Sequence, residues 1–273
     1  MRSCSWAAML AALGVMATAG IARAQDSDSS AASPASSNPH DAQPERPTVA
    51  THAGTVAPGW VELEAGVERD QLDGAHALFT PTVLKIGIVP RVQLDLLGSF
   101  QHLSGTIPDY SGIGDVSVAL KWRALEKVPV LGDFAVQPSL KLPAGSAEHG
   151  TGTGTTDASL LLISSHDWGD YALDVNASYT RRSGDGSAAP NNATLWTVSF
   201  GAPVYEKLGW VAELYGYPRT TGPAGEDGII AVLTGPTFEI EKWIVLDAGV
   251  IFPVTGAQPH ALYAGLTWNI GKL

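Results

Sequence analysis

Apolar and polar side chains alternate with a period of two through most of this chain, from about Trp60 to Ile270. Residues 92–96, with the sequence VQLDL, are one example. Successive side chains of a β-strand point to opposite faces, so each such run has one apolar and one polar face. Runs of this kind that follow one another through hairpin connections, with no helix between them, indicate a closed antiparallel barrel. A membrane barrel is the case in which the apolar face points outward.

The first 24 residues have the features of an export signal. Arg2 gives a positively charged start, residues 7–20 form a short apolar core, and the Ala-Arg-Ala sequence at 22–24 is a cleavage site before Gln25. The apolar core is too short for a helix that spans a membrane. We therefore predict a cleaved signal peptide over residues 1–24.

The mature chain left by this cleavage has no thiol, because the only cysteine, Cys4, lies in the signal. Disulfides and cysteine metal sites are thereby excluded. Loss of Arg2 and Arg23 changes the formal net charge from −11 to −13, and so acidic a chain argues against nucleic acid as a partner. No later stretch reaches the roughly 20 apolar residues of a helical membrane span. Export combined with alternating strands indicates the outer membrane of a Gram-negative bacterium.

Residues 25–58 are rich in Ser, Ala, Pro, Asp and Thr and contain almost no aromatic side chains. Such a composition buries too little apolar area to offset the entropy of ordering. We predict a disordered, periplasmic N-terminal segment over 25–58, with a better ordered part at 46–58. Our hypothesis is that this part tucks into the periplasmic mouth of the barrel, where Arg46 could meet Glu62 or Glu64.

The predicted barrel domain covers residues 59–273 and has about twelve strands, an even number of the kind found in bacterial outer-membrane barrels. Each strand is close to the roughly 9–11 residues that cross a bilayer at a tilt. The strands are expected near 60–68, 76–88, 92–102, 115–124, 133–142, 157–166, 170–181, 193–202, 209–217, 228–240, 243–252 and 260–270.

Short and long connections alternate along this predicted barrel. The short ones lie at 89–91, 168–169, 205–207 and 241–242, with a somewhat longer turn at 126–132. The long ones lie at 104–114, 143–156, 182–192, 218–227 and 253–259. Membrane barrels have short periplasmic turns and long outer loops, whereas a soluble sandwich does not need this alternation.

Tryptophan residues gather at the short-turn ends of the predicted strands. We expect them to form an aromatic girdle at the periplasmic membrane interface, where Trp and Tyr are enriched. The residues are Trp60, Trp122, Trp168, Trp210, Trp243 and Trp268. The pattern is imperfect, because Trp60 and Trp243 share the parity of the inward-facing residues.

The predicted lipid-facing positions carry no charge, as a membrane barrel requires, since a charge facing lipid at mid-depth costs roughly 2–4 kcal/mol. They include Val61, Leu63, Val67, Leu84, Ile86, Leu94, Leu96, Val116, Val118, Leu120, Val136, Leu140, Leu173, Val175, Val198, Phe200, Leu214, Val232, Phe238, Ile244, Leu246, Leu266 and Ile270.

The opposite parity is mostly acidic, with a few Lys and Arg residues among the carboxylates. The predicted lumen-lining residues along a solute path are Glu62, Glu64, Glu68, Asp95, Asp115, Lys121, Arg123, Lys141, Asp174, Glu213 and Asp247. Opposite charges could pair across the lumen, or the charges could line a wet pore that favours cations or neutral polar solutes. The sequence leaves both uses open. We favour a narrow lumen partly filled by paired charges, because about twelve strands make a small barrel.

No motif for catalysis or for a cofactor is present. The GTGTG sequence at 150–154 lacks the Lys-Ser/Thr and the helix of a phosphate-binding loop, so we interpret it as an outer loop. The aspartates at positions 109, 115, 157, 185 and 227 lack the spacing of a calcium loop. Ser and His residues are neighbours at 102–104 and 164–166, but no nucleophile motif surrounds them. We therefore predict no enzymatic activity, no cofactor and no metal site.

Several motifs, in this order, resemble an outer-membrane transporter family named for the MetA-pathway of phenol degradation. They are the entry segment with RPT at 46–48 and VAPGWVELEAG at 56–66, then GIGDVSVALKW at 112–122, KLPAG at 141–145 followed by Asp157, ELYG at 213–216, and AGLTW at 264–268. The similarity covers nearly all of residues 46–270. One departure is the C-terminus, because such barrels usually end on an aromatic residue and here Ile270 stands in that place.

This resemblance implies a barrel that moves aromatic or other apolar compounds across the outer membrane. We expect a passive channel driven by the solute gradient. Its expected partners are outer-membrane lipid, lipopolysaccharide, the barrel-assembly machinery during biogenesis, and an unidentified small solute. The alternatives are a closed barrel with a structural or surface-binding role and no transport, a membrane lipase or protease, and a secreted soluble sandwich.

Overall fold

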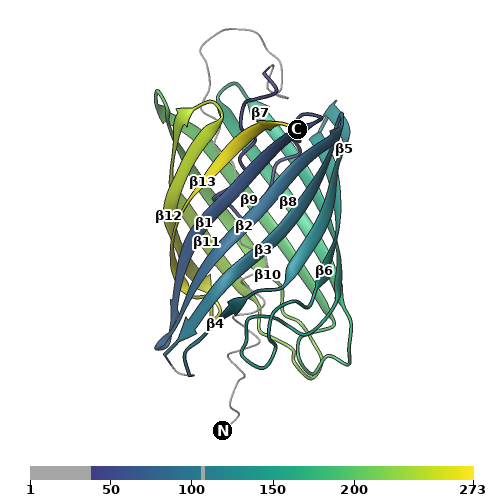
Figure 1. Cartoon of the computed structure of the whole chain (residues 1–273), viewed down its shortest axis with the longest axis vertical. Coiled ribbons are helices and arrows are strands. Elements are labelled where there is room, and N and C mark those ends of the chain that lie inside the picture. Colours follow the sequence, from purple (N-terminus) through teal and green to yellow (C-terminus); the bar gives the residue numbers. More distant parts are fainter. Residues whose placement is uncertain (1–37, 106–107) are drawn as a thin grey trace.

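The computed structural model describes residues 38–105 and 108–273, and it has the shape of a tilted-strand barrel (Figure 1). The predicted signal peptide lies outside the described residues. The strands are β1 Trp60–Leu72, β2 Ala75–Val89, β3 Val92–Ser104, β4 Tyr110–Ile113, β5 Val116–Val128, β6 Gly132–Leu142, β7 Asp157–Trp168, β8 Tyr171–Arg182, β9 Asn192–Tyr205, β10 Leu208–Tyr217, β11 Ile229–Glu241, β12 Ile244–Thr255 and β13 His260–Lys272. Among the described residues, no helix is long and apolar enough to cross a membrane.

Twelve long antiparallel strands close into a ring. Each strand pairs with its neighbours in sequence, and β1 pairs with β13 from Trp60–Lys272 to Gln71–His260. The additional strand, β4, is short and pairs only with the outer end of β3, between Phe100–Ile113 and Leu103–Tyr110. Closure leaves no edge among the twelve long strands, so most backbone polar groups of the wall are satisfied within the protein. The predicted fold is therefore confirmed.

The two ends of the barrel differ in the length of their connections. Short turns and the C-terminus lie at the upper end in Figure 1, and the longer connections lie at the lower end. The exception is the β1–β2 hairpin at the long-loop end, where only Asp73 and Gly74 separate the strands. Both residues have positive φ, 45° and 82°, as a tight two-residue hairpin turn requires.

The predicted period-two pattern agrees with the exposure of the side chains. On β5, for example, Val116, Val118, Leu120 and Trp122 are each more than a third exposed, whereas Lys121 between them is fully buried. The exposed parity forms an apolar outer surface that suits hydrocarbon. Of the predicted outward residues, Val61 is buried, at 9% exposure, and it stands beside a register shift in the β1–β13 pairing.

The interior is less uniformly polar than the sequence pattern indicated. One part of the inner wall, on β9 to β13, is an apolar cluster. Its buried members are Leu195, Val211, Tyr215, Ala231, Leu233, Ile251, Ala261 and Tyr263. These residues occupy inward positions where alternation alone predicts polar groups. They can do so because they pack against each other and against Val49 from the N-terminal part of the chain.

A charge placed on the outer face should destabilise the barrel in a depth-dependent way. Val198 lies in the middle of β9, between Val175 and Leu214. We expect Val198→Arg to lower the free energy of unfolding in a bilayer by roughly 2–4 kcal/mol. The control, Tyr205→Arg at the short-turn end of the same strand, should change it by about 0–1 kcal/mol. Denaturant titration in lipid vesicles measures both, and equal losses would contradict an outward-facing apolar belt.

Candidate functional site: an occupied barrel lumen

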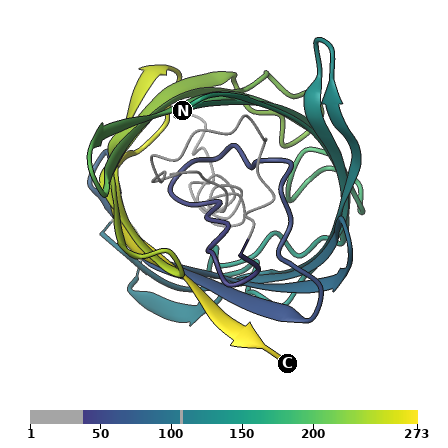
Figure 2. The same ribbon diagram turned by 90° about the horizontal axis from the view of Figure 1, so that it is seen from above.

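Residues 38–58 lie inside the ring of strands, and we call them the inner segment (Figure 2). Seen from above, the inner segment curls around the inside of the wall before it joins β1 at Trp60. Our sequence interpretation had treated residues 25–58 as a periplasmic segment of which only 46–58 enters the mouth. In the structure residues 40–42 lie at the short-turn rim, and residues 45–53 lie farther inside, where polar side chains of the inner wall accept hydrogen bonds from their backbone.

The inner segment enters past two tryptophan residues. The His40 ring lies 5.0 Å from the ring of Trp60 and stacks at 5.5 Å on that of Trp243. Its Nε2 atom lies 3.1 Å from the carbonyl oxygen of Asn269. Trp60 and Trp243 are the two tryptophan residues that break the outward parity of the predicted girdle. Their contact with His40 explains that exception, and the outward-facing girdle is limited to the other four.

Carboxylates of the wall bind backbone N–H groups of the inner segment. The N–H group of Gln43 donates to Glu62 at 2.7 Å, and that of Glu45 donates to Glu64 at 2.6 Å. Farther round the barrel, both oxygens of Glu213 accept hydrogen bonds, from Val49 at 2.7 Å and Ala50 at 2.6 Å. Each contact satisfies a buried backbone donor and gives a buried carboxylate a hydrogen-bond partner.

Uncharged side chains continue this pattern over the rest of the inner segment. Asn176 accepts the N–H group of Thr51 at 2.7 Å and donates to the carbonyl oxygen of the same residue at 2.9 Å. The N–H group of Ala53 donates to Ser165 at 2.8 Å, and that of Val56 donates to Gln93 at 2.7 Å. The anchors from Glu62 to Gln93 therefore follow one another round the circumference, on β1, β10, β8, β7 and β3.

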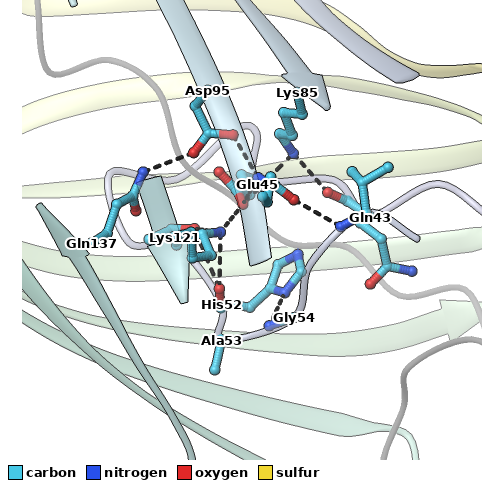
Figure 3. Close-up of polar contacts among 12 residues, drawn as sticks. Gln43, Glu45, His52, Ala53, Gly54, Lys85, Asp95, Lys121 and Gln137 are labelled. Atoms are coloured by element: carbon cyan, nitrogen blue, oxygen red, sulfur yellow. Dashed lines mark hydrogen bonds and ion pairs between the residues drawn. The ribbon is translucent and has the colours of Figure 1, made fainter. Parts of the chain in front are cut away.

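Lys85 and Lys121 neutralise the acidic groups around the inner segment (Figure 3). The Nζ atom of Lys85 lies 3.0 Å from Glu62 and 2.5 Å from Glu64, and it donates to the carbonyl oxygen of Gln43 at 2.7 Å. Lys121 pairs with Glu45. Burial alone would raise the pKa of Glu45, but the ammonium groups of Lys121 and Lys85 outweigh it and lower that pKa.

Arg46 pairs with Asp247. The hypothesis that it meets Glu62 or Glu64 is therefore wrong. Its Nε and Nη2 atoms each donate to an Asp247 oxygen at 3.2 Å. The guanidinium group fits because Gly66 and Gly265 have no side chain there. A Cβ atom at either glycine would lie 2.5 Å from the Arg46 side chain.

A second charge cluster lies at the long-loop end. Lys141 contacts Asp115 at 2.6 Å and Asp157 at 3.2 Å, and Arg182 contacts Asp157 at 3.2 Å. Asp115 also accepts the N–H group of Thr153 at 3.0 Å. These bonds hold part of the 143–156 loop, including the GTGTG sequence, against the inside of the wall. Thr151 and Thr153 are accordingly buried, so this outer loop folds inward over the end of the lumen.

A pocket of 140 Å³ remains between the inner segment and this outer cluster. It is lined by Glu45, Val49, Thr51, Val83, Asp95, Leu97, Ser117, Ala119, Gln137, Ser139, Lys141, Thr153, Asp157, Ser159, Leu161, Ser178, Thr180, Arg182 and Leu195. Within the described residues, no group of three or more His, Cys, Asp or Glu side chains could hold a metal ion.

The predicted lumen residues divide among these places. Glu62, Glu64, Lys121, Glu213 and Asp247 contact the inner segment, whereas Asp95, Asp115 and Lys141 lie at the pocket or beside it. Asp174 accepts a hydrogen bond from the Ser165 hydroxyl group at 2.5 Å. Arg123 contacts Glu126 at 3.2 Å at the short-turn end, and Glu68 is half-buried on β1.

Sequence reasoning missed Lys85 and Arg182 among the charged residues of the lumen. The signal for Lys85 was present, because it lies between the outward residues Leu84 and Ile86 and so has inward parity. The signal for Arg182 was weaker, since it ends β8 at a loop boundary.

Comparison with known proteins places this geometry among outer-membrane barrels. A family model described as "Putative MetA-pathway of phenol degradation" matches residues 45–268. A similar solved structure is the COG4313 outer membrane channel from Pseudomonas putida F1, with a TM-score of 0.62 and 12% identity over 78% of this chain and 96% of that one. Comparison with curated proteins gave no match.

Two further solved structures share the fold at lower similarity. The NanC porin has a TM-score of 0.50 and 12% identity over 76% of this chain and 100% of that one. The β domain of the Bordetella autotransporter BrkA has a TM-score of 0.50 and 15% identity over 78% of this chain and 100% of that one. At these identities the likeness concerns the fold alone.

Weakening one wall carboxylate should loosen the inner segment locally. We expect Glu213→Gln to speed hydrogen exchange of the Val49 and Ala50 amides by roughly tenfold or more, because hydrogen bonds to charged groups contribute about 1.5–3 kcal/mol each. Exchange measured by mass spectrometry on the protein in nanodiscs tests this. Glu148→Gln, on an exposed loop, is the matched control. Unchanged exchange at residues 49 and 50 would show that Glu213 does not hold them.

Proposed function

Since the chain belongs to the MetA-pathway phenol-degradation family, we propose that it is an outer-membrane channel for passive passage of small solutes, aromatic or apolar compounds among them. In this proposal the protein is exported by a cleaved signal peptide to the outer membrane of a Gram-negative bacterium. Lipid and lipopolysaccharide surround it there, after insertion by the barrel-assembly machinery.

The observation that carries this proposal is a closed barrel with an apolar outside and a pocket within its polar lumen. The pocket lies on the long-loop side of the inner segment, where a solute entering from outside the cell would arrive first. The matched family and the channel and porin folds add support for a transport role. In this proposal no step uses nucleotide hydrolysis, and the solute concentration gradient drives passage.

The inner segment stands in the path of such a solute. Passage to the periplasmic side requires either a gap beside the segment or its displacement from the wall. Displacement would break the bonds at Glu62, Glu64 and Glu213, and it would leave the Glu213 carboxylate without its two backbone donors, whereas Glu62 and Glu64 would keep Lys85. We therefore propose a low basal conductance that is limited by the inner segment.

The same occupancy favours a second candidate function. A barrel whose lumen is permanently filled would serve a structural or surface-binding role through its long loops, without transport. The two functions differ in one measurable property, the current through a single barrel.

Removing the inner segment should open the barrel. We expect a variant that lacks residues 26–58 to show a single-channel conductance in planar bilayers several times that of the wild type, because the ring closes through β1–β13 pairing without those residues. The control variant lacks only residues 26–37 and should conduct like the wild type.

Two outcomes would contradict this prediction. Equal conductance of the wild type and the 26–58 deletion would mean that the inner segment does not limit passage. Absence of current from both proteins, when they show the heat-modifiable mobility of folded barrels, would support the structural role and reject the channel.

A further inference from the structure

Arg69 is an exposed arginine on the lipid-facing side of the barrel wall. Its neighbours along β1, Glu68 and Asp70, have inward parity, and Asp70 is buried. Strand register places Arg69 between Leu262 on β13 and Leu78 on β2, which are 61% and 43% exposed. The strand therefore carries a guanidinium group on the outer surface, at the edge of the apolar belt.

Within the described part of the chain, no residue forms an ion pair or a hydrogen bond with the Arg69 side chain. The other described arginines each contact a carboxylate or an amide oxygen. A charged group that faces hydrocarbon is costly, and long side chains near a membrane interface extend toward the headgroups. The partner that the chain does not provide for Arg69 must therefore come from that interface.

The outward side chains around Arg69 on the same side of the wall are polar. One row, in register across β13, β1 and β2, lies directly beyond Arg69 and consists of His260, Gln71 and His76. On β3, His102 pairs with Leu78, and its Nδ1 atom lies 2.8 Å from the hydroxyl oxygen of Ser111. We call the set of Arg69, Gln71, His76, His102 and His260 the outer patch.

The outer patch lies at the boundary between the apolar belt and the long-loop end, which is the lower end in Figure 1. Nearer the middle of the barrel, Val67, Phe100 and Ile113 are exposed apolar side chains on the same face. Beyond the patch, β1 and β2 meet in their hairpin turn. Long loops of membrane barrels face the cell exterior, so the headgroups at this level belong to the outer leaflet.

No carboxylate shares the outward parity with Arg69 on the described strands of this face. The carboxylates of β1 and β3 all have inward parity, and β2, β4 and β13 contain none. The planar guanidinium group binds phosphate through two parallel N–H bonds, and imidazole and amide N–H groups are further donors. The face is therefore complementary to a phosphate group in charge and in hydrogen bonding.

We propose that the outer patch is a binding site for the phosphorylated headgroup of an outer-leaflet lipid. Arg69 pairs with a phosphate group, and Gln71 and the three histidines donate to the remaining headgroup oxygens. Leu262 and Leu78 lie against the acyl chains of the same lipid. This inference goes beyond the channel function and depends only on the orientation of the barrel in the outer membrane.

Binding of lipid A to the detergent-folded protein, followed by native mass spectrometry, tests the proposal. We expect Arg69→Gln to weaken binding about fivefold or more, because a hydrogen bond to a charged group is lost. The matched control is Arg181→Gln. Arg181 is an exposed arginine at the long-loop end of β8 that donates to Asn192 at 3.0 Å, and its loss should leave lipid A binding unchanged. Lipid A without its phosphate groups should bind the wild type as weakly as intact lipid A binds Arg69→Gln.

Heat-modifiable mobility checks that each variant folds. Should Arg69→Gln not fold, Arg69→Lys removes the planar fork and keeps the charge, and it should still weaken binding about twofold or more. Single-channel conductance of the Arg69 variant should equal that of the wild type, so the outcome for this site and the outcome for the channel are read from separate measurements.

Three results would overturn the proposal. The first is equal binding of lipid A by the wild type and the Arg69 variant. The second is an equal loss in the Arg69 and Arg181 variants, which would mean a general attraction of basic groups to anionic lipid. The third is equally tight binding of lipid A with and without its phosphate groups, which would mean that apolar contacts alone hold the lipid.

Discussion

Hydrogen bonds from the buried backbone of the inner segment to carboxylates of the barrel wall keep this lumen filled. A segment inside a barrel has no neighbouring strand to pair with, so its N–H groups need side-chain acceptors. Glu62, Glu64 and Glu213 provide them, and each carboxylate gains the donors that burial would otherwise deny it. Lys85 and Lys121 then balance the remaining negative charge. Wall and inner segment therefore depend on each other, and the open and paired-charge interpretations of the inward residues are both too simple. Besides water and opposite charges, the inward carboxylates have another partner, which is the backbone of the inner segment.

The fold could be predicted from the sequence because membrane insertion imposes a repeating constraint. One face of every strand must be apolar, so parity alone separates Leu94 and Leu96 from Asp95, and Leu120 from Lys121. The candidate site was predictable only in part. Parity tells which residues face inward but not what they meet there. The polar composition of residues 38–58 is typical of disorder, since it lacks the apolar area to order itself. In the structure it is ordered by a surface that comes from distant strands, which no local pattern of those residues encodes.

The volume of the inward side chains decides where the lumen is filled, and the alternation of polar and apolar residues does not report that volume. A ring of twelve strands has a fixed diameter, and the inner segment occupies only part of it. The remaining space is filled where inward residues are large, as at Tyr215 and Tyr263, and is left open where they are small, as at Ser139 and Ser159. A hydropathy pattern treats Ser and Tyr as two inward residues of moderate polarity. Their difference in volume is what decides the shape of the space inside.

The covalent link between the inner segment and β1 has a consequence for biogenesis. The ring of hydrogen bonds closes where β1 meets the C-terminal strand β13, and the chain just before β1 lies within that ring. Pairing of β1 with β13 therefore encloses a segment of the same chain. The wall must close and the lumen must be filled in the same folding process. The inner segment and its ionic partners must therefore enter the membrane shielded by the wall that closes around them.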